Sequence, residues 1–385
     1  MTDRSGYGVS RRKKSTRFLL QAWEIIESNI PRIRTANILL ISIRALATEV
    51  AKNLVLAGID SLTIVDNEVV TEDDLGAQFF ISDADVGKNR AEAALPQIKN
   101  LNPRVQVTAV TTPILNLPPE FYNPFTLVIA SDLPWATLST VSAAARLAGK
   151  PSYLAGSHGF YGFIFADLIE HKYIIEREVG NRTTVVGPET ITRSIINVTK
   201  KKENGKNVEL VGKREIYSPF LLANTSPLPK EVLGNRRRLK AVPPLLSCLR
   251  GLWEFEKLYI RTPLSANTDQ DDLKAFTNLA SNAHKELQLP AETLNGDFLK
   301  SFLQNLGAEL APVTAFLGGQ LAQDVINVLG GREQPIQNFL LFDGDESKGL
   351  VYALHPIFQD GLDGMQPVSV SNGFQVPAGV EAVVL

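Results

Sequence analysis

A turn near the start of the chain has the position of a phosphate-binding site. It lies between the apolar segment ANILLIS (36–42) and the helical segment ALATEVAKNLVLAG (45–58), and a second apolar segment, SLTIVD (61–66), follows. A strand, a tight turn and a helix in this order offer the backbone N–H groups of the helix N-terminus to a phosphate. An acidic residue at the end of the second strand, here Asp66, commonly contacts a ribose. The spacing therefore indicates the first unit of a nucleotide-binding fold.

This turn lacks the glycines that phosphate binding normally requires. Glycines allow both the tight bend and the close approach of the backbone to the phosphate. Here the turn reads Ser42-Ile43-Arg44-Ala45-Leu46-Ala47, so we expect side chains to crowd a phosphate. The unit is then kept as a scaffold, and Asp66 is equally well explained as a cap on the segment that follows it.

The single cysteine is the only thiol that could act as a nucleophile. Cys248 lies in PPLLSCLRGLWEF, on the apolar side of a predicted helix. Free cysteines are among the most buried residue types, so we expect core packing and assign no catalytic residue. One cysteine excludes a disulfide within the chain and a thiolate zinc site, and it favours a reducing compartment. The four histidines are far apart, and we expect no metal site: His158, His171, His284 and His355.

The composition is that of an ordinary globular protein, with 385 residues, 44% hydrophobic and 21% charged. A formal net charge of -2 gives no electrostatic reason to expect binding to a nucleic acid or a membrane surface. No run of about 18 apolar residues predicts a membrane span. We therefore expect neither a nucleic acid nor a membrane among the partners.

Strands and helices alternate in the first half of the chain. Further strands are expected over VQVTAV (105–110), TLVIAS (126–131) and PSYLAG (151–156), with helices over 85–100 and 135–148. This alternation predicts an α/β protein with a Rossmann-like, doubly wound, mainly parallel sheet.

The rest of the chain divides by composition and period. We expect a mobile basic N-terminus (1–16), a Rossmann-like core (17–180) that opens with a helix over 17–30, and a hairpin or loop arm (181–229) that turns near Asn204-Gly205. A helical insert (230–303), a C-terminal part of the core fold (304–356) and a disordered tail (357–385) follow.

The segment 65–103 resembles the adenylation domain of ubiquitin-like-protein activating enzymes. It contains Gln78-Phe79-Phe80 and the run Asp85-Val86-Gly87-Lys88-Asn89-Arg90-Ala91. In active members an Asn and an Arg stand where this chain has Gly76 and Ala77, and a Lys stands at Arg90. The later Asp-Asn pair reads Asp132-Leu133 here. The resemblance implies a degenerate adenylation domain in which Asp66, Arg90 and Asp132 are remnants, and in which two isolated carboxylates would repel ATP.

Two further blocks narrow the resemblance. AGSHGFYGFIFADLIEHKYIIE (155–176) and ELAPVTAFLGGQLAQDVINVLGGREQPIQNFLLFDG (309–344) are similar to the regulatory subunits of SUMO-activating enzymes, fungal ones in particular. This implies a non-catalytic subunit of a heterodimer with no cofactor of its own. The partner subunit would bind ATP and Mg²⁺, adenylate SUMO and carry the catalytic cysteine. SUMO would be a partner of this chain through the heterodimeric complex.

The resemblance also suggests which residues meet the partner. Gly76–Ile81 and Gly156–Phe165 are rich in Phe and Gly, and aromatic residues are enriched in interface cores. The candidate interface residues are Gln78, Phe79, Phe80, His158, Phe160 and Phe163. Core packing within this chain is the alternative for the four phenylalanines.

The N-terminus departs from the family. There an arginine of the first helix normally reaches into the partner's ATP site, but SRRKKSTRFLLQAW lacks that motif, so we assign this role to no residue. Two basic segments, TKKKENGK (199–206) and NRRRLK (235–240), are solvated loops or a nuclear localisation signal. We expect a nuclear protein and leave a cytoplasmic pool open.

Three other functions remain as alternatives. A regulatory subunit for the Nedd-type modifier normally carries a longer helical insert. A free-standing adenylyltransferase of the ThiF or MoeB kind needs the lost Asn and Arg. A nicotinamide-dependent oxidoreductase needs the missing glycines.

Overall fold

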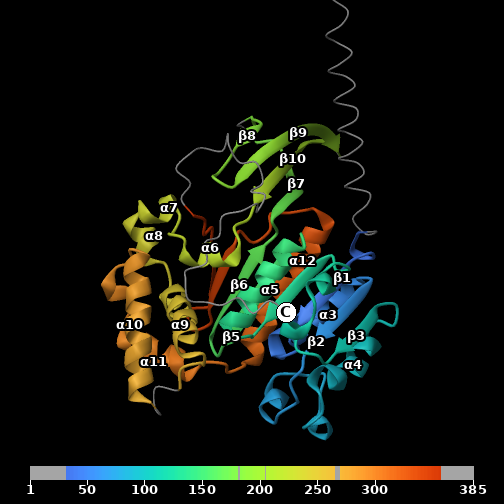
Figure 1. Cartoon of the computed structure of the whole chain (residues 1–385). Helices are drawn as coiled ribbons and strands as arrows, with labels where there is room; N and C mark the ends of the chain where they lie inside the picture. Colours follow the sequence, from blue (N-terminus) through green and yellow to red (C-terminus); the bar gives the residue numbers. More distant parts are fainter. Residues whose placement is uncertain (1–31, 181–182, 204, 265–268, 357–385) are drawn as a thin grey trace, which may run out of the picture.

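The computed structural model describes residues 32–180, 183–203, 205–264 and 269–356 (Figure 1). The expected mobile N-terminus, the helix over 17–30 and the expected disordered tail lie outside the described residues.

One eight-stranded sheet forms the centre of the molecule, in the order β12-β11-β6-β5-β4-β1-β2-β3. Its strands are β1 (Asn37–Ile41), β2 (Ser61–Val65), β3 (Gln106–Val110), β4 (Leu127–Ser131), β5 (Ser152–His158), β6 (Tyr161–Asp167), β11 (Phe339–Asp343) and β12 (Lys348–Tyr352). Strands β1 to β5 pair in parallel, and β6, β11 and β12 extend the sheet antiparallel. The predicted Rossmann-like, mainly parallel sheet is confirmed.

Both faces of this sheet are covered by helices. Along β1, Ile38 and Leu40 enter one apolar core while Leu39 and Ile41 enter the other, as expected for a strand buried on both sides. One layer contains α3 (Ala45–Ala57), α4 (Arg90–Leu101) and α12 (Ala311–Gly330), and the other contains α5 (Trp135–Leu147) and most helices of the insert.

Helix α3 forms where its apolar period predicts it. Leu46, Val50 and Leu54 are fully buried, and Gly58 ends the helix in the left-handed conformation with φ 80°. Helix α12 packs closely against α3, because a Cβ at Gly318 would lie 2.8 Å from the carbonyl oxygen of Leu46. This close packing explains the small residues on one side of α12.

No strand is predicted over β6 from the sequence alone. The run from Tyr161 to Asp167 is buried at every position, so this strand, like β1, is covered on both faces. It forms a hairpin with β5 through Gly159, whose φ is 60°. A Cβ at Gly159 would lie 1.9 Å from Asn305 Oδ1, so the hairpin depends on a residue without a side chain.

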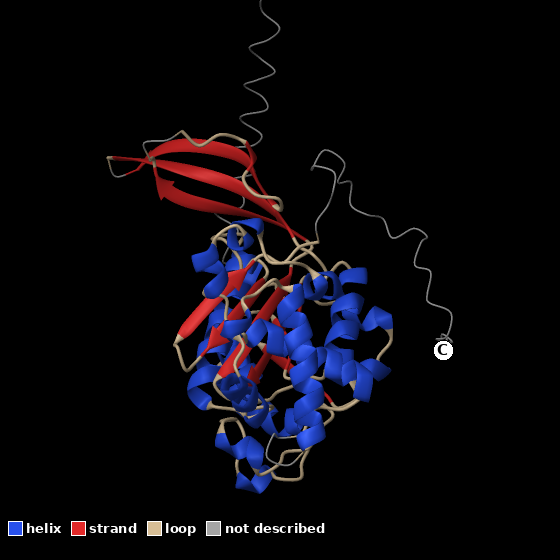
Figure 2. Cartoon of the chain, turned by 90° about the vertical axis from the view of Figure 1, so that its left-hand side faces the viewer, coloured by secondary structure: helices blue, strands red, loops and turns tan. Residues whose placement is uncertain are grey.

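A second sheet projects from one end of the body (Figure 2). Its order is β7-β10-β9-β8, with β7 (Glu170–Glu178), β8 (Gly187–Pro188), β9 (Arg193–Glu203) and β10 (Lys206–Ile216). The predicted hairpin is present, although Asn204 in its turn lies outside the described residues. The arm also takes in β7, which the sequence places in the core, because β10 pairs with β7 along nine residue pairs from Val208 to Ile216.

Six helices connect this arm to α12 within the described residues: α6 (Phe220–Thr225), α7 (Lys230–Leu233), α8 (Arg236–Lys240), α9 (Leu245–Tyr259), α10 (Gln270–Glu286) and α11 (Gly296–Gln304). The helical insert therefore begins at α6, before the predicted start at residue 230. Helix α6 belongs to it because the buried ring of Phe220 packs against Trp135 of α5. Cys248 of α9 is fully buried, which confirms core packing, and burial raises the pKa of its thiol far above the ordinary value. None of the described helices is long and apolar enough to cross a membrane.

Candidate functional site

A cleft of about 810 Å³ opens at the carboxyl ends of the parallel strands. Residues that follow three neighbouring strands line it: Ser42 after β1, Asp66 after β2 and Asp132 after β4. Open parallel sheets bind their ligands at this edge. The cleft is therefore where a nucleotide would bind in a working adenylation domain.

The turn between β1 and α3 keeps its tight bend without glycine. Ser42 adopts φ 71°, a left-handed conformation that ordinarily favours glycine. Its hydroxyl is buried, lines the cleft and has no hydrogen-bond partner among the described residues. The strand–helix geometry has thus been retained although the glycines have not.

The N–H groups of this turn are already occupied by carboxylates of the same chain. The Ile43 N–H donates to Asp66 Oδ2 at 2.9 Å, and the Ala45 N–H donates to Glu309 Oε1 at 2.9 Å. A phosphate at the N-terminus of α3 would need these donors. The contribution of Glu309 was not foreseen, because it lies far along the chain from the turn and nothing in its local sequence indicates this partner.

Arg90 is bound within a buried acidic pair. Its guanidinium contacts Asp66 at 2.9 Å and Asp74 at 3.0 Å, and all three side chains are largely buried. Burial alone would raise the pKa of Asp74, but hydrogen bonds from Thr71 and the charge of Arg90 outweigh it and lower the pKa. Arg90 is therefore engaged, and Asp66 is not the isolated carboxylate that the sequence suggested.

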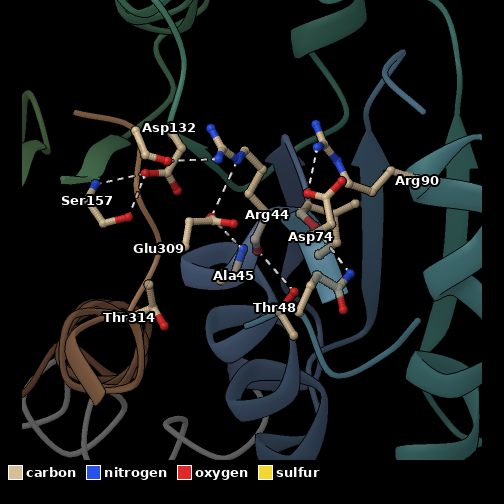
Figure 3. Close-up of polar contacts among 12 residues, drawn as sticks. Arg44, Ala45, Thr48, Asp74, Arg90, Asp132, Ser157, Glu309 and Thr314 are labelled. Carbon is tan, nitrogen blue, oxygen red and sulfur yellow. Dashed lines mark hydrogen bonds and ion pairs between the residues drawn. The ribbon is translucent and has the colours of Figure 1, made fainter. Parts of the chain in front are cut away.

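Asp132 and Arg44 also line the cleft, and Glu309 contacts Arg44 (Figure 3). Asp132 Oδ1 accepts the backbone N–H of Ser157 at 2.8 Å, while Oδ2 is buried with no hydrogen-bond partner among the described residues. Burial raises the pKa of Asp132, and the charge of Arg44 opposes that shift. Burial and the nearby charge of Asp132 raise the pKa of Glu309 to about 7.

Arg44 ties this cluster to the neighbouring linker. Its Nε lies 3.4 Å from Glu309 Oε1, and its NH2 group donates to the carbonyl of Gly307 at 3.1 Å. The N–H of Gly307 in turn donates to His158 Nδ1 at 3.3 Å. Burial, followed by the charge of Arg44, lowers the pKa of His158 to about 4, so His158 is neutral and serves as an acceptor here.

The charges of the cleft do not suit a triphosphate. Six acidic residues line it against two arginines: Asp66, Glu68, Asp73, Asp74, Asp132 and Glu256, with Arg44 and Arg90. Both arginines are paired with carboxylates of this chain. No group of three or more His, Cys, Asp and Glu residues within the described ranges is arranged to hold a metal ion. Six acidic residues facing two paired arginines are an unfavourable setting for the charge of a triphosphate.

The six candidate interface residues divide by exposure. Gln78, Phe80 and Phe163 are each 5% exposed or less. Gln78 holds the turn, since its Nε2 donates to the Ile43 carbonyl at 3.3 Å and its Oε1 accepts the N–H of Phe80. Placing these three side chains at a partner surface is therefore wrong, because they are part of the core of this chain. His158 lies between the β5–β6 turn and the linker that contains Gly307.

Two of the predicted aromatic residues do lie on the surface. Phe79 is 49% exposed, with the ammonium of Lys52 from α3 at 5.1 Å from the ring centroid, and Phe160 is 44% exposed. A third exposed ring, Phe316 of α12, was not predicted and stacks on Phe342 at 4.4 Å. Its position in the apolar run APVTAF gave no sign that it faces outward.

Comparisons with known proteins point to one family. The ThiF family profile matches residues 18–355. The chain is 34% identical to the DNA damage tolerance protein RHC31 of Saccharomyces cerevisiae, over 81% of this chain and 88% of that protein. It is 32% identical to SUMO-activating enzyme subunit 1 of Xenopus laevis and 31% identical to the human protein of that name, in both cases over 84% of this chain and 90% of the relative. The resemblance found in the sequence is confirmed.

Proposed function

Because the chain belongs to the ThiF family, we propose that it is the regulatory, non-catalytic subunit of a SUMO-activating heterodimer. The observation that carries the proposal is the occupied turn: the N–H groups of Ile43 and Ala45, and the guanidinium of Arg90, are bound to carboxylates of the same chain. A domain that keeps the adenylation fold while these three donors are engaged within the chain is expected to act through its surface. The choice of SUMO as the modifier is supported by relatives named SUMO-activating enzyme subunit 1, which match over most of their length.

In this proposal the chemistry belongs to the partner subunit. The partner binds ATP and Mg²⁺, adenylates the C-terminal glycine of SUMO and forms the thioester on its own cysteine. Cys248 of this chain is buried, and a buried thiol with a raised pKa is a poor nucleophile.

The contact with the partner is proposed to include an aromatic surface, defined here as Phe79, Phe160 and Phe316. Phe316 stacks on Phe342 of β11, and the carbonyl of Phe160 accepts the N–H of Gly344 directly after β11. Phe79 adjoins Lys52 of α3, the helix that packs against α12. Exposed aromatic rings are typical of the centre of a protein–protein interface.

A nuclear location is part of the proposal. Of the two basic segments, Lys200–Lys202 lie in β9 and pair with β10, whereas Arg236–Lys240 form the short exposed helix α8. We expect α8 to direct nuclear import. A fluorescent fusion with Arg236, Arg237 and Arg238 changed to Ala should spread into the cytoplasm, and an unchanged nuclear signal would refute this part.

Reconstitution tests the function directly. The purified chain is mixed with a fungal catalytic SUMO-activating subunit, SUMO and Mg²⁺-ATP, and thioester on the catalytic subunit is followed on non-reducing gels. We expect thioester only when both subunits are present. In the control, the Nedd-type modifier replaces SUMO and the catalytic subunit for that modifier replaces the SUMO-activating one, and we expect no thioester. Thioester with the Nedd-type pair would favour that alternative, and ATP–pyrophosphate exchange by this chain alone would favour a free-standing adenylyltransferase.

A further inference from the structure

Glu309 occupies the position that an anion would take at the N-terminus of α3. Its carboxylate accepts the N–H of Ala45 at 2.9 Å and lies 3.4 Å from Nε of Arg44 (Figure 3). The Glu309 side chain is 7% exposed. Charge-assisted contacts of this kind are the ones a helix N-terminus and an arginine offer to phosphate or sulfate.

A second observation at the same turn is that two of its donors lack a hydrogen-bond partner among the described residues. Ser42 is 3% exposed and lines the cleft, and its buried hydroxyl has no hydrogen-bond partner among the described residues. Arg44 Nε is likewise buried and forms no hydrogen bond of good geometry, although Glu309 is close. A tetrahedral anion has more acceptor oxygens than one carboxylate and could use these donors.

We propose that the turn Ser42–Ala45 is a latent binding site for a small dianion of the phosphate or sulfate class, and that Glu309 masks it as an internal substitute for the anion. This goes beyond the proposed function, since it concerns what the turn of this chain can bind when the mask is removed. Asp66 blocks the neighbouring Ile43 N–H in the same way, so the latent site is smaller than a nucleotide site.

The charged groups that face Glu309 influence whether its carboxyl group is ionised, and hence how strongly it occupies the donors of the turn. Arg44 favours its ionised form, whereas Asp132 after β4 and, more weakly, Asp74 favour its neutral form. His158 faces Arg44 from β5 and is neutral. When Glu309 is protonated, its attraction for Arg44 falls and an anion competes more easily for the same donors.

The experiment uses the full chain and anion rescue of thermal stability. Glu309→Ala removes the carboxylate that contacts Arg44 Nε and accepts the Ala45 N–H, and sulfate is compared with chloride at equal ionic strength. We expect sulfate to raise the Tm of Glu309→Ala well beyond its effect on the natural chain. The double variant Glu309→Ala/Arg44→Ala should lose this extra gain.

A control is needed because sulfate stabilises many proteins without binding to a specific site. Glu256→Ala is the matched control. Glu256 lines the same cleft and accepts the N–H of Trp135 at the start of α5 at 2.7 Å, with no arginine in its pair. An equal sulfate gain in Glu256→Ala and Glu309→Ala, or no extra gain in Glu309→Ala, would overturn the proposal.

Glu309→Gln keeps the test open if the alanine variant does not fold. Gln retains the shape and one acceptor but no charge, so calorimetry with sulfate should show binding at least roughly tenfold tighter than to the natural chain at pH 8. Sulfate keeps its charge between pH 5 and pH 8, and the natural chain should gain affinity for it as the pH falls through about 7, whereas Glu309→Gln should not. Equal affinities at pH 8 would refute the mask.

Discussion

The guanidinium of Arg90 binds the carboxylate of Asp66 through two N–H groups, from Nε to Oδ2 at 2.9 Å and from NH2 to Oδ1 at 3.3 Å. A third contact runs from NH1 to Asp74 Oδ1 at 3.0 Å. This buried fork fixes the end of β2 against the start of α4. It also engages the Arg90 guanidinium within this chain.

The first prediction concerns this fork. Arg90→Ala would leave two buried carboxylates without a cation, which typically costs about 3–5 kcal/mol. Urea unfolding followed by circular dichroism should show that loss in the free energy of unfolding. Arg90→Lys keeps the charge without the planar fork and should lose less. A loss within about 0.5 kcal/mol for Arg90→Ala would mean that the fork contributes nothing to stability.

The second prediction concerns the pH dependence of Glu309. Its pKa is about 7 in the folded chain against an ordinary 4.5, so the folded state holds this proton to higher pH than the unfolded state. The free energy of unfolding of the natural chain should therefore fall, relative to Glu309→Gln, as the pH rises from about 4.5 through about 7. Denaturant titrations of both proteins across this range measure the difference. A difference that is flat or that increases with pH would contradict the assigned shift.

The sequence predicted the elements around the cleft better than the contacts inside it. Helix α3 and the strand ends at Ser42, Asp66 and Asp132 follow from local apolar periods and from Gly58. The pairing of Ala45 with Glu309 spans 264 residues, and no local pattern encodes it. The missing glycines correctly indicated an altered turn, but not that carboxylates of the same chain would satisfy its donors.

The third prediction concerns the aromatic surface. Phe79→Asp and Phe160→Asp place charges on exposed rings, so each variant should stay folded by circular dichroism. Each should lose binding to the catalytic subunit in pull-down assays, because a buried unpaired charge disfavours an interface. Thioester formation on that subunit should fall in parallel.

Two controls separate surface from core. Leu147→Asp changes a side chain that is 79% exposed at the end of α5, on the opposite layer, and should leave partner binding intact. Phe80→Asp changes a side chain that is 5% exposed and should unfold the chain. If Phe79→Asp and Phe160→Asp bind the partner as well as Leu147→Asp does, the contact lies elsewhere.

Phe79 and Phe80 show why exposure could not be assigned from residue type. They are adjacent, and their rings are 4.7 Å apart, yet one is half exposed and the other buried. The buried Gln78 side chain accepts the N–H of Phe80, so the backbone at the buried ring is held by a contact that residue type does not reveal. Only the three-dimensional path of the chain decides which ring faces a partner.

The fourth prediction concerns Cys248. Cys248→Ala removes a buried sulfur and should cost about 1 kcal/mol, which a domain of ordinary stability tolerates. The reconstituted pair should form SUMO thioester at the natural rate at a temperature where the variant is folded. A thiol reagent should react with Cys248 only after denaturation. Loss of thioester formation by the folded variant would show that this thiol takes part in the reaction.

We propose that this chain keeps an adenylation fold that binds no nucleotide, and that its partner supplies the nucleotide site. Equilibrium dialysis with labelled ATP and Mg²⁺ tests this most directly, on the chain alone and on the reconstituted heterodimer. Since the donors at Ile43, Ala45 and Arg90 are occupied, we expect no binding to the chain alone and one ATP for each heterodimer. Micromolar binding to the chain alone, or two ATP molecules for each heterodimer, would contradict it.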